Sequence, residues 1–319
     1  MAPPALTETS AFPQPPSPGT VSPAAQQALQ NLPDPGGPED LQAHRAMCAE
    51  LQRTLGGSQM ERHGVRMEER AIAGVPVRIY TSAAPAQRPD GVLLNLHGGG
   101  FIVDAGSVTE NVPVAAYTGM PVISVRYRLA PEHPFPAALD DAERVYREVI
   151  ARHGASRLIL YGTSAGACLC AQLLVRLRER QLPLPRALGF FSGTADLSRR
   201  GDSEFFFRPE RDRVPSVEQF FEYVGHHDRS SQQVSPIFTD LRGFPPTLCI
   251  AGTRDFMLSQ TGLFHQALLA ADVDARLLVF EAMPHAHWIF LDLPESDQAF
   301  RAMAQFFTSQ LRTPGRPFA

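Results

Sequence analysis

The stretch "LILYGTSAGACLCAQLLV" at residues 158–175 carries no charged side chain and is long enough to cross a membrane. A Gly-Thr-Ser-Ala-Gly turn interrupts it at residues 162–166, so we predict a buried strand, a tight turn and the start of a buried helix. This is the context that the pattern G-x-S-x-G requires, and it makes Ser164 project from the edge of a sheet. The N–H groups at the start of the helix, including that of Ala165, would then face a negative charge developing beside Ser164. The alternative is a packing turn of small side chains.

Short apolar segments, separated by helical patterns, run through the chain on both sides of this stretch. Two of them alternate in polarity and predict an antiparallel start, and six are continuously apolar, as strands buried on both faces are. The alternating segments are "VRMEER" and "VPVRIY", and the continuous ones are "VLLNL", "PVISVR", "RLILY", "ALGFF", "PTLCIA" and "RLLVFE". Alternation of strands and helices favours an α/β fold, with an eight-stranded, mostly parallel sheet covered by helices on both faces.

Both ends of the chain differ in composition from this predicted core. Residues 1–38 contain ten prolines and little apolar periodicity, which predicts a disordered or loosely attached tail. A helical pattern over residues 39–55 ends at Gly56-Gly57. The predicted segments are N-terminal cap helices at 39–60, a core at 61–198 and 233–312, a cap insertion at 199–232 and a C-terminal tail at 313–319.

The segment at residues 199–232 interrupts the alternation of strands and helices. It holds charges and several aromatic side chains, among them Phe205, Phe206 and Phe220, and shows no strand pattern. We interpret it as a lid that gives a site an apolar wall. The alternative is a helical insertion whose aromatic side chains pack on the main domain.

A glycine-rich loop follows the strand "VLLNL". In "LLNLHGGGFIVDAG", three glycines after His97 let the backbone approach a ligand closely and direct N–H groups at it. This arrangement suits an oxyanion hole in which Gly99 and Gly100 are donors, although an ordinary flexible loop is the alternative. Because His97 lies in the donor loop, we expect it to have a structural role and not to be the general base.

A serine nucleophile needs a general base, and the base needs an acid that orients it. Asp255 follows the strand "PTLCIA", at the edge where open α/β sheets form their sites. The last strand leads into "EAMPHAHWIF" at residues 281–290, which holds His285 and His287. The chain order Ser164, Asp255, His285 is the order of this architecture. The alternatives are that Asp255 caps the next helix and that the histidines are surface residues.

Composition argues against several functional classes. The formal net charge is −4 and there is no basic block, so we predict no nucleic-acid or membrane partner. The four cysteines lack CxxC or zinc-ribbon spacing, which favours a reduced, cytoplasmic chain. We interpret Cys168 and Cys170 as packing residues and predict no metal site. The proline-rich N-terminal sequence leads us to expect no signal peptide.

Four blocks of sequence occur together: "HGGGF" at 97–101, "YRLAPEHPFPAALDD" at 127–141, "YGTSAGA" at 161–167, and "AGTRDFMLS" to "EAMPHAHW" at 251–288. The segment "SPIFTDLRGFPPTL" at 235–248 adds to them. Together they resemble the hormone-sensitive-lipase-like family of α/β-hydrolases. The resemblance is to the bacterial carboxylesterase branch with a GTSAG turn, whose sister branch has GDSAG, and it covers roughly residues 40–312.

The resemblance implies an α/β-hydrolase fold with a helical cap built from the N-terminal helices and the 199–232 insertion. It implies that the catalytic residues are the nucleophile Ser164, the acid Asp255 and the base His285, and that the oxyanion-hole donors are Gly99, Gly100 and Ala165. Glu132 matches a family position whose role the sequence does not explain. The candidate substrate-pocket residues are Phe101, Phe205, Phe206, Phe220 and His287.

Two residues depart from the family's usual ending, which is Gly-Met-Pro-His, a small residue and an aromatic. Ala282 replaces the glycine, and this matters if the position requires a positive φ. His287 replaces a phenylalanine, and we interpret it as an aromatic-sized packing residue. The alternative hypothesis is that protonated His287 disfavours the charged form of His285.

These features predict a serine hydrolase that cleaves small-molecule carboxylic esters with short to medium acyl chains and needs no metal or organic cofactor. A lactonase, an arylamidase or an acyltransferase would use the same triad. A non-catalytic ligand receptor on the same fold would usually lack a triad member. A homodimer is a further expectation, because the family's edge strand often pairs between subunits.

Overall fold

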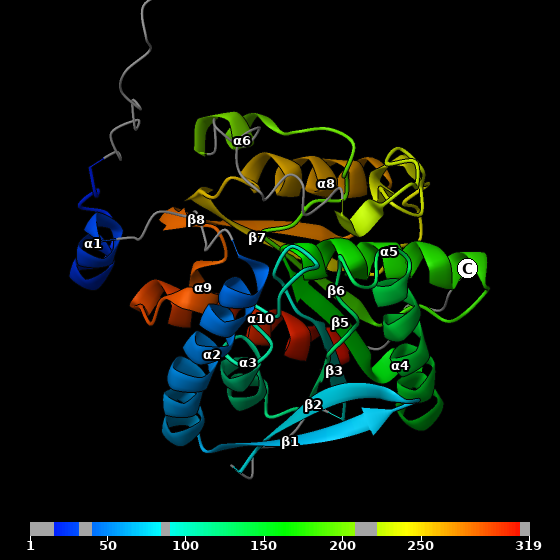
Figure 1. Cartoon of the computed structure of the whole chain (residues 1–319), viewed down its shortest axis with the longest axis horizontal. Coiled ribbons are helices and arrows are strands. Elements are labelled where there is room, and N and C mark those ends of the chain that lie inside the picture. Colours follow the sequence, from blue (N-terminus) through cyan, green and yellow to red (C-terminus); the bar gives the residue numbers. More distant parts are fainter. Residues whose placement is uncertain (1–15, 32–39, 84–89, 208–221, 313–319) are drawn as a thin grey trace, which may run out of the picture.

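The computed structural model describes residues 16–31, 40–83, 90–207 and 222–312. Its centre is one eight-stranded sheet with the strand order β1-β2-β4-β3-β5-β6-β7-β8 (Figure 1). The strands are β1 (Val65–Ile72), β2 (Val75–Ser82), β3 (Val92–Leu96), β4 (Val122–Val125), β5 (Leu158–Thr163), β6 (Ala187–Phe191), β7 (Thr247–Arg254) and β8 (Ala275–Pro284). β2 is antiparallel to both of its neighbours, and all other neighbouring strands are parallel. The predicted mostly parallel sheet is confirmed.

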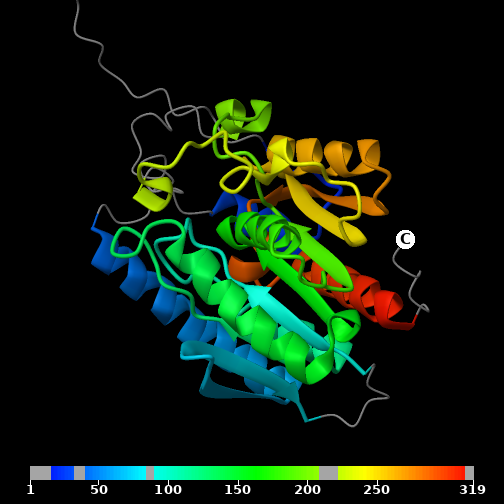
Figure 2. The ribbon, with the colours of Figure 1, turned by 90° about the vertical axis from the view of Figure 1, so that its right-hand side faces the viewer.

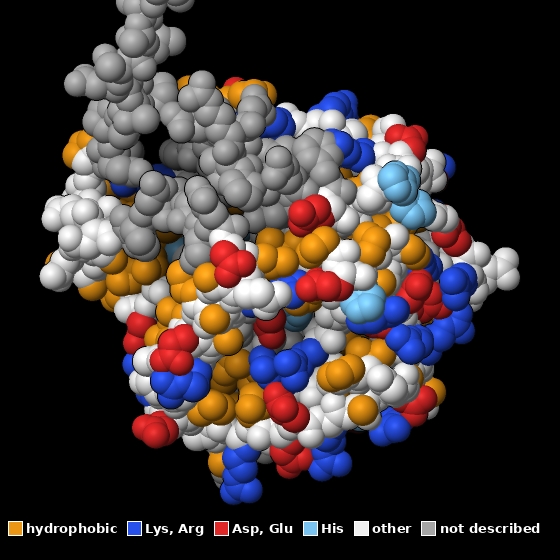
Figure 3. Space-filling view, viewed as in Figure 1, with side chains coloured by type: hydrophobic (Ala, Val, Ile, Leu, Met, Phe, Trp, Pro, Cys, Tyr) orange, Lys and Arg blue, Asp and Glu red, His pale blue; other side chains and the backbone are white. Residues whose placement is uncertain are grey.

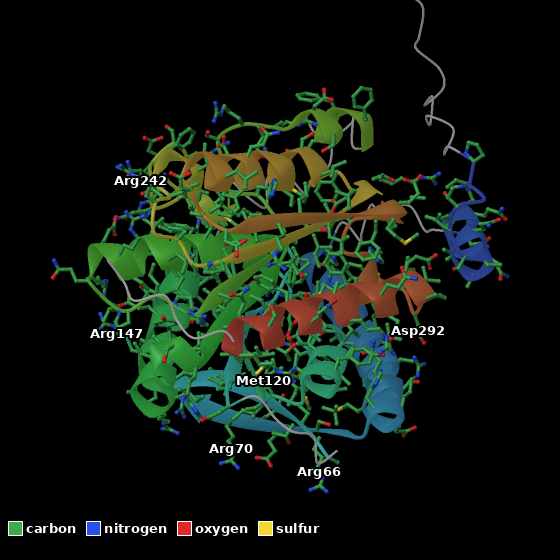
Figure 4. The ribbon with its side chains drawn as sticks, turned by 180° about the vertical axis from the view of Figure 1, so that it is seen from behind. Arg66, Arg70, Met120, Arg147, Arg242 and Asp292 are labelled. Atoms are coloured by element: carbon green, nitrogen blue, oxygen red, sulfur yellow. The ribbon has the colours of Figure 1, made fainter. Side chains whose placement is uncertain are left out.

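Helices cover both faces of this sheet. One face carries α4 (Ala137–His153), α5 (Ala165–Glu179) and α8 (Leu258–Ala270), and the other carries α3 (Asn111–Thr118) and α10 (Pro294–Arg312). Figure 2 shows the strands between the green helices α4 and α5 and the red helix α10. In the view from behind, α10 and α3 lie next to each other across the second face (Figure 4). Short 3-10 helices lie at Ala155–Arg157 and Pro236–Phe238.

The register of the parallel strands brings the loops of the predicted site to one edge. Leu96 at the end of β3 pairs with Gly162 of β5, and Arg254 at the end of β7 pairs with Pro284 of β8. Every residue of β3, β4, β5 and β6 is buried, which explains why these strands read as continuous apolar runs.

Helix α2 (Leu41–His63) is longer than the sequence predicts. It continues through Gly56-Gly57 and ends at His63, followed by the capping residue Gly64, which has a φ of 61°. The predicted end is wrong because Gly56 is required for packing, since a Cβ at this position would lie 2.4 Å from Cγ1 of Val108. Gly56 therefore lets α2 approach the segment before α3 closely.

The predicted N-terminal tail contains an ordered helix, α1 (Pro23–Gln30), at the left of Figure 1. Val21, Ala25 and Leu29 recur at four-residue spacing and are buried against the end of β8 and the start of α10. The prediction of a loose tail over residues 1–38 is therefore wrong for α1, because this short apolar face has a surface to cover. The parts at 1–15 and 32–38 lie outside the described residues.

The start of α1 is also fixed by hydrogen bonds. The Ser22 hydroxyl accepts a hydrogen bond from the Ala25 amide at 3.1 Å and so caps the helix. The amide and the hydroxyl of Ser22 donate to the two carboxylate oxygens of Glu295, at 2.7 and 3.0 Å. These contacts join α1 to the first turn of α10.

The insertion predicted at 199–232 is described in two parts. Helix α6 (Asp202–Phe207) packs on the start of α8, and the Ser203 hydroxyl donates to the carbonyl of Phe256 at 2.8 Å. In the second part, Tyr223 is fully buried and its hydroxyl donates to Gln172 of α5 at 2.7 Å. Residues 208–221, between these parts, lie outside the described residues.

The surface and the cysteines agree with the composition. Arg side chains are interspersed with Asp and Glu over the face drawn in Figure 3, and the chain contains no lysine. Across the part of the chain that the structure describes, we find no helix with the length and apolar character to span a membrane. The cysteines are buried and free, and burial raises the pKa of the Cys168 and Cys170 thiols well above their ordinary value, as expected of packing residues.

Candidate active site

Ser164 stands at a sharp turn between β5 and α5. Its φ of 58° and ψ of −121° are unfavourable for a residue with a Cβ. Glycines on both sides allow the turn, because a Cβ on Gly162 would lie 2.5 Å from the carbonyl carbon of Gly166. A Cβ on Gly166 would lie 1.9 Å from the carbonyl oxygen of Leu96. The two glycines of G-x-S-x-G are thus required by the close approach of the turn to itself and to β3.

The structure brings Ser164, His285 and Asp255 together from the ends of three strands. Nε2 of His285 lies 3.0 Å from Oγ of Ser164, and Nδ1 lies 2.8 Å from Oδ1 of Asp255. Both distances are those of ordinary hydrogen bonds. A continuous chain of hydrogen bonds therefore runs from a carboxylate through an imidazole to a hydroxyl.

Asp255 is fully buried. Burial by itself would raise its pKa, but the charge and hydrogen bond of His285 hold the pKa below its ordinary value, with smaller contributions from the Ser192 hydroxyl and the Met257 amide. The Met257 amide donates to the carboxylate at 2.8 Å. Asp255 is therefore ionised at neutral pH and favours the His285 tautomer that carries its proton on Nδ1.

The glycine-rich loop after β3 lies beside the same serine. A Cβ on Gly98 would lie 3.4 Å from Cβ of Ser164. Gly99 and Gly100 have φ values of 117° and 61°, a conformation that glycine adopts readily. No described residue accepts a hydrogen bond from the amides of Gly99, Gly100 or Ala165. These N–H groups are available to a ligand oxygen near Ser164.

His97 holds the donor loop in place. Its ring stacks on Tyr127 with 4.2 Å between centroids, and its Nδ1 lies 2.8 Å from the carbonyl oxygen of Gly98. The Tyr127 hydroxyl donates to the carbonyl of His97 at 2.6 Å. The expected structural role of His97 agrees with these contacts.

His287 is the first residue of α9 (His287–Phe290) and has no exposed surface. Its ring lies 5.3 Å from that of Phe280 and 5.0 Å from that of Trp288, between centroids. Among the described residues, neither ring nitrogen has a hydrogen-bond partner of ordinary geometry. Burial lowers the pKa of His287 to about 4, and Glu295 and Asp255 offset this only in part. These observations support the packing interpretation and place His287 in the core.

The other candidate pocket residues occupy different environments in the described structure. Phe101 is buried and stacks on Tyr223, with 3.5 Å between ring centroids, so it joins the donor loop to the insertion. Phe205 and Phe206 on α6 are 54% and 70% exposed. Phe220 lies outside the described residues.

Sequence reasoning misses two side chains that hold the histidine. The Phe256 ring lies 4.3 Å from the imidazole of His285, between centroids. The Ser192 hydroxyl, at the end of β6, accepts a hydrogen bond from the Ala286 amide at 3.3 Å. Phe256 could have been suspected from its place next to Asp255, whereas Ser192 belongs to no local motif.

The structure also shows a contact of Glu132, whose role the sequence does not explain. Its carboxylate accepts two hydrogen bonds from Arg45 of α2, at 2.6 and 2.8 Å, and these lower the pKa of Glu132 to about 2. Arg45 donates as well to the carbonyls of Ile102 and Ala130. Because Glu132 is half-exposed, the pair adds little stability, but it ties α2 to the loop that carries the N–H donors.

The fold and the strand-end site define an α/β hydrolase. The site combines a buried acid, an imidazole, a serine on a tight strand-to-helix turn and N–H groups from which no described residue accepts a hydrogen bond. The chain belongs to the family described as the alpha/beta hydrolase fold, whose family model matches residues 93–289. Across the described ranges, no group of three or more His, Cys, Asp and Glu side chains is arranged to hold a metal ion.

Known esterases resemble the chain in sequence and structure. It is 31% identical over 249 residues to an esterase of Acinetobacter venetianus, covering 75% of this chain and 80% of that protein. It is 31% identical over 229 residues to an acetyl-hydrolase of Streptomyces hygroscopicus, covering 70% of this chain and 77% of that protein. The solved structure of esterase E25 superposes with a TM-score of 0.82 at 31% identity, covering 93% of this chain and 97% of that one. The solved structure of an esterase described as from the bacterial hormone-sensitive lipase family superposes with a TM-score of 0.77 at 30% identity. The match covers 87% of this chain and 94% of that one. The chain is an enzyme of the carboxylesterase type.

Proposed function

We propose that the chain hydrolyses carboxylic esters through a Ser164–His285–Asp255 triad and a covalent acyl-enzyme. The observation that carries this proposal is the pair of hydrogen bonds, 2.8 and 3.0 Å long, that links Asp255 through His285 to Ser164. A serine hydroxyl is a weak nucleophile by itself, and this arrangement gives it a base that a buried carboxylate orients.

In the first step, Nε2 of His285 takes the hydroxyl proton while Oγ of Ser164 attacks the ester carbonyl carbon. The carbonyl oxygen becomes an oxyanion, for which the amides of Gly99, Gly100 and Ala165 are the proposed donors. Loss of one such donor costs about 100- to 1000-fold in rate in enzymes of this kind. His285 then returns the proton to the leaving alcohol, and Ser164 keeps the acyl group.

In the second step, water attacks the acyl-enzyme. His285 takes a proton from the water as its oxygen bonds to the carbonyl carbon, and then gives the proton to Oγ of Ser164 as the carboxylic acid leaves. In both steps the Asp255 carboxylate stabilises the imidazolium form of His285 without taking up the proton itself.

The proposed substrates are small esters with short to medium acyl chains. The relative from Streptomyces hygroscopicus is named an acetyl-hydrolase, which supports short acyl groups. The Gly-Thr-Ser-Ala-Gly turn supports placing the chain in the GTSAG branch of the hormone-sensitive-lipase-like family. A homodimer and a cytoplasmic location stay predictions from the sequence.

The test compares the full chain with Ser164→Ala on p-nitrophenyl esters of increasing acyl length, with a lactone and an anilide beside them. We expect the highest kcat/KM on short esters and a loss of at least about 1000-fold in kcat for Ser164→Ala. The matched control is Ser230→Ala, which removes an exposed hydroxyl and should keep full activity. A wild type without esterase activity, or an active Ser164→Ala, would refute the proposal.

A further inference from the structure

A second carboxyl group, that of Glu110, lies behind the proposed triad. Glu110 directly precedes α3 and has no exposed surface. Its Oε1 accepts hydrogen bonds from the Thr163 hydroxyl and, at 3.2 Å, from Nε1 of Trp288. Its Oε2 accepts one from Nδ2 of Asn95 at 3.1 Å. One buried carboxyl group thus receives three donors from three separate parts of the chain.

Each donor belongs to a segment that carries a part of the site. Thr163 is the last residue of β5 and directly precedes Ser164. Asn95 lies in β3, two residues before His97 and the loop of N–H donors. Trp288 lies in α9, three residues after His285. Glu110 therefore contacts the three segments that carry the nucleophile, the donor loop and the base.

Further hydrogen bonds hold these contacts in place. Oδ1 of Asn95 accepts hydrogen bonds from Nδ2 of Asn111 at 2.9 Å and from the Ser124 hydroxyl at 2.8 Å. The Tyr161 hydroxyl donates to Oδ1 of Asn111. Since Asn95, Asn111 and Ser124 are fully buried, no water competes for these groups, and the network fixes the orientation of the Asn95 amide toward Glu110.

The electrostatic surroundings of Glu110 are neutral. Burial raises its pKa to about 7, and the three hydrogen bonds, from Thr163, Trp288 and Asn95, limit the rise. The titratable groups that interact with Glu110 among the described residues are Tyr161 of β5 and Cys170 of α5, whose pKa values lie well above neutral. At pH 7 these neighbours carry no charge, and the set of three donors suits an ionised carboxylate.

We propose that Glu110 is a positioning residue for ester hydrolysis, which holds the Ser164 turn, the donor loop and the His285 loop in one geometry by accepting hydrogen bonds from Thr163, Asn95 and Trp288. This inference rests on the proposed function of the triad. Glu110 does not contact a reacting atom, so it acts on the rate through the residues that it aligns. A misplacement of about 1 Å among catalytic groups can cost about 100-fold in rate.

The test variant is Glu110→Gln, which keeps the size of the side chain. A glutamine amide has one acceptor oxygen and an NH2 group, so one of the three donors always faces another donor. We expect kcat to fall about 10- to 100-fold with KM changed less than about threefold, and labelling of Ser164 by a fluorophosphonate to slow in parallel. The matched control is Thr118→Val, which removes a buried hydroxyl of α3 that donates to the carbonyl of Val114 and makes no hydrogen bond to Glu110 or its three donors among the described residues. It should keep kcat within about threefold.

A spectroscopic signal separates positioning from a general loss of stability. Trp288 is the only tryptophan of the chain, so intrinsic fluorescence reports on the ring that donates to Glu110. In the wild type we expect the emission to titrate near pH 7 with Glu110 and again near pH 4 with His287. In Glu110→Gln the transition near pH 7 should disappear and the one near pH 4 should remain.

A folded Glu110→Gln with wild-type kcat, or with an unchanged fluorescence titration near pH 7, would overturn the inference. If Glu110→Gln does not fold, Thr163→Val removes only the donor next to Ser164, and the inference then requires a lower kcat at unchanged KM. An inactive wild type would refute the proposed function instead, and the fluorescence titration would still test the contact between Glu110 and Trp288.

Discussion

Replacing His287 with phenylalanine should stabilise the fold, and the gain should grow as the pH falls from 7 to 4. The His287 ring is fully buried between Phe280 and Trp288, and its nitrogens have no hydrogen-bond partner of ordinary geometry among the described residues. A phenyl ring fits the same aromatic surroundings and has no nitrogen to desolvate. At pH 7, removal of an unsatisfied buried polar group should add about 1–3 kcal/mol to the free energy of unfolding.

The pH dependence follows from the difference between the pKa of His287 in the folded and unfolded chains. In the unfolded chain the pKa is near 6.5, and in the folded protein burial lowers it to about 4. Between these values the unfolded state binds more protons, so stability falls as the pH falls and the loss is complete below about pH 4. At 1.36 kcal/mol per pKa unit, the loss reaches about 3 kcal/mol, or roughly 6 °C in Tm. The substitution His287→Phe removes this loss entirely, because a phenyl ring does not titrate.

The assay is denaturant unfolding of the wild type and His287→Phe at several values between pH 4 and pH 7. The control is His133→Gln, which changes an exposed histidine. It should leave the change in the free energy of unfolding between pH 7 and pH 4 the same as in the wild type. The same variants also test the coupling hypothesis for His285. Because His287 is neutral above about pH 4, His287→Phe should leave the acid limb of the pH–rate profile in place. A stability difference that does not grow toward pH 4, or an acid limb that moves, would refute this reasoning.

Two further substitutions test the loop around His285 and the helix that packs near it. Ala282→Gly should stabilise the protein by about 1 kcal/mol, because Ala282 has a φ of 58° and glycine adopts this conformation without a Cβ clash. An unchanged or lower Tm of the variant would contradict this. Leu29→Ala should lower the free energy of unfolding by about 2 kcal/mol, because Leu29 is only 4% exposed where α1 packs on β8. The control Gln30→Ala, on the exposed side of α1, should leave the free energy of unfolding unchanged. Equal stability of the two α1 variants in thermal unfolding would show that the helix is not docked.

The strands and the meeting of Ser164 with Asp255 and His285 could be predicted because their signals are local. A strand buried on both faces needs a continuous apolar run, and a strand-to-helix turn this tight needs Gly162 and Gly166. Parallel strands then bring their carboxyl ends to one edge, so residues far apart in the sequence meet without further information.

Other features could not be predicted because they depend on contacts between distant segments. In the sequence, Gly56 resembles the end of a helix. Its role in packing follows from the close approach of Val108, a residue 52 positions later in the chain. Helix α1 has too few apolar residues to be stable alone, and its order depends on the end of β8 and the start of α10. Glu110 belongs to no motif, and its three partners lie in three different elements.

The loop around His285 shows how such distant contacts support the site. Ala282 and Ala286 both have left-handed backbone conformations, with φ values of 58° and 49°, and each costs of order 1–2 kcal/mol. Side chains from other strands hold the two amides: Thr253 accepts from Ala282 at 2.7 Å, and Ser192 accepts from Ala286 at 3.3 Å. The strained residues lie on both sides of His285, so relaxing either one would move the imidazole relative to Ser164. We infer that contacts from distant segments hold the strained backbone around His285 and so keep its imidazole in position. Residues outside every motif, such as Ser192 and Thr253, therefore matter for the site.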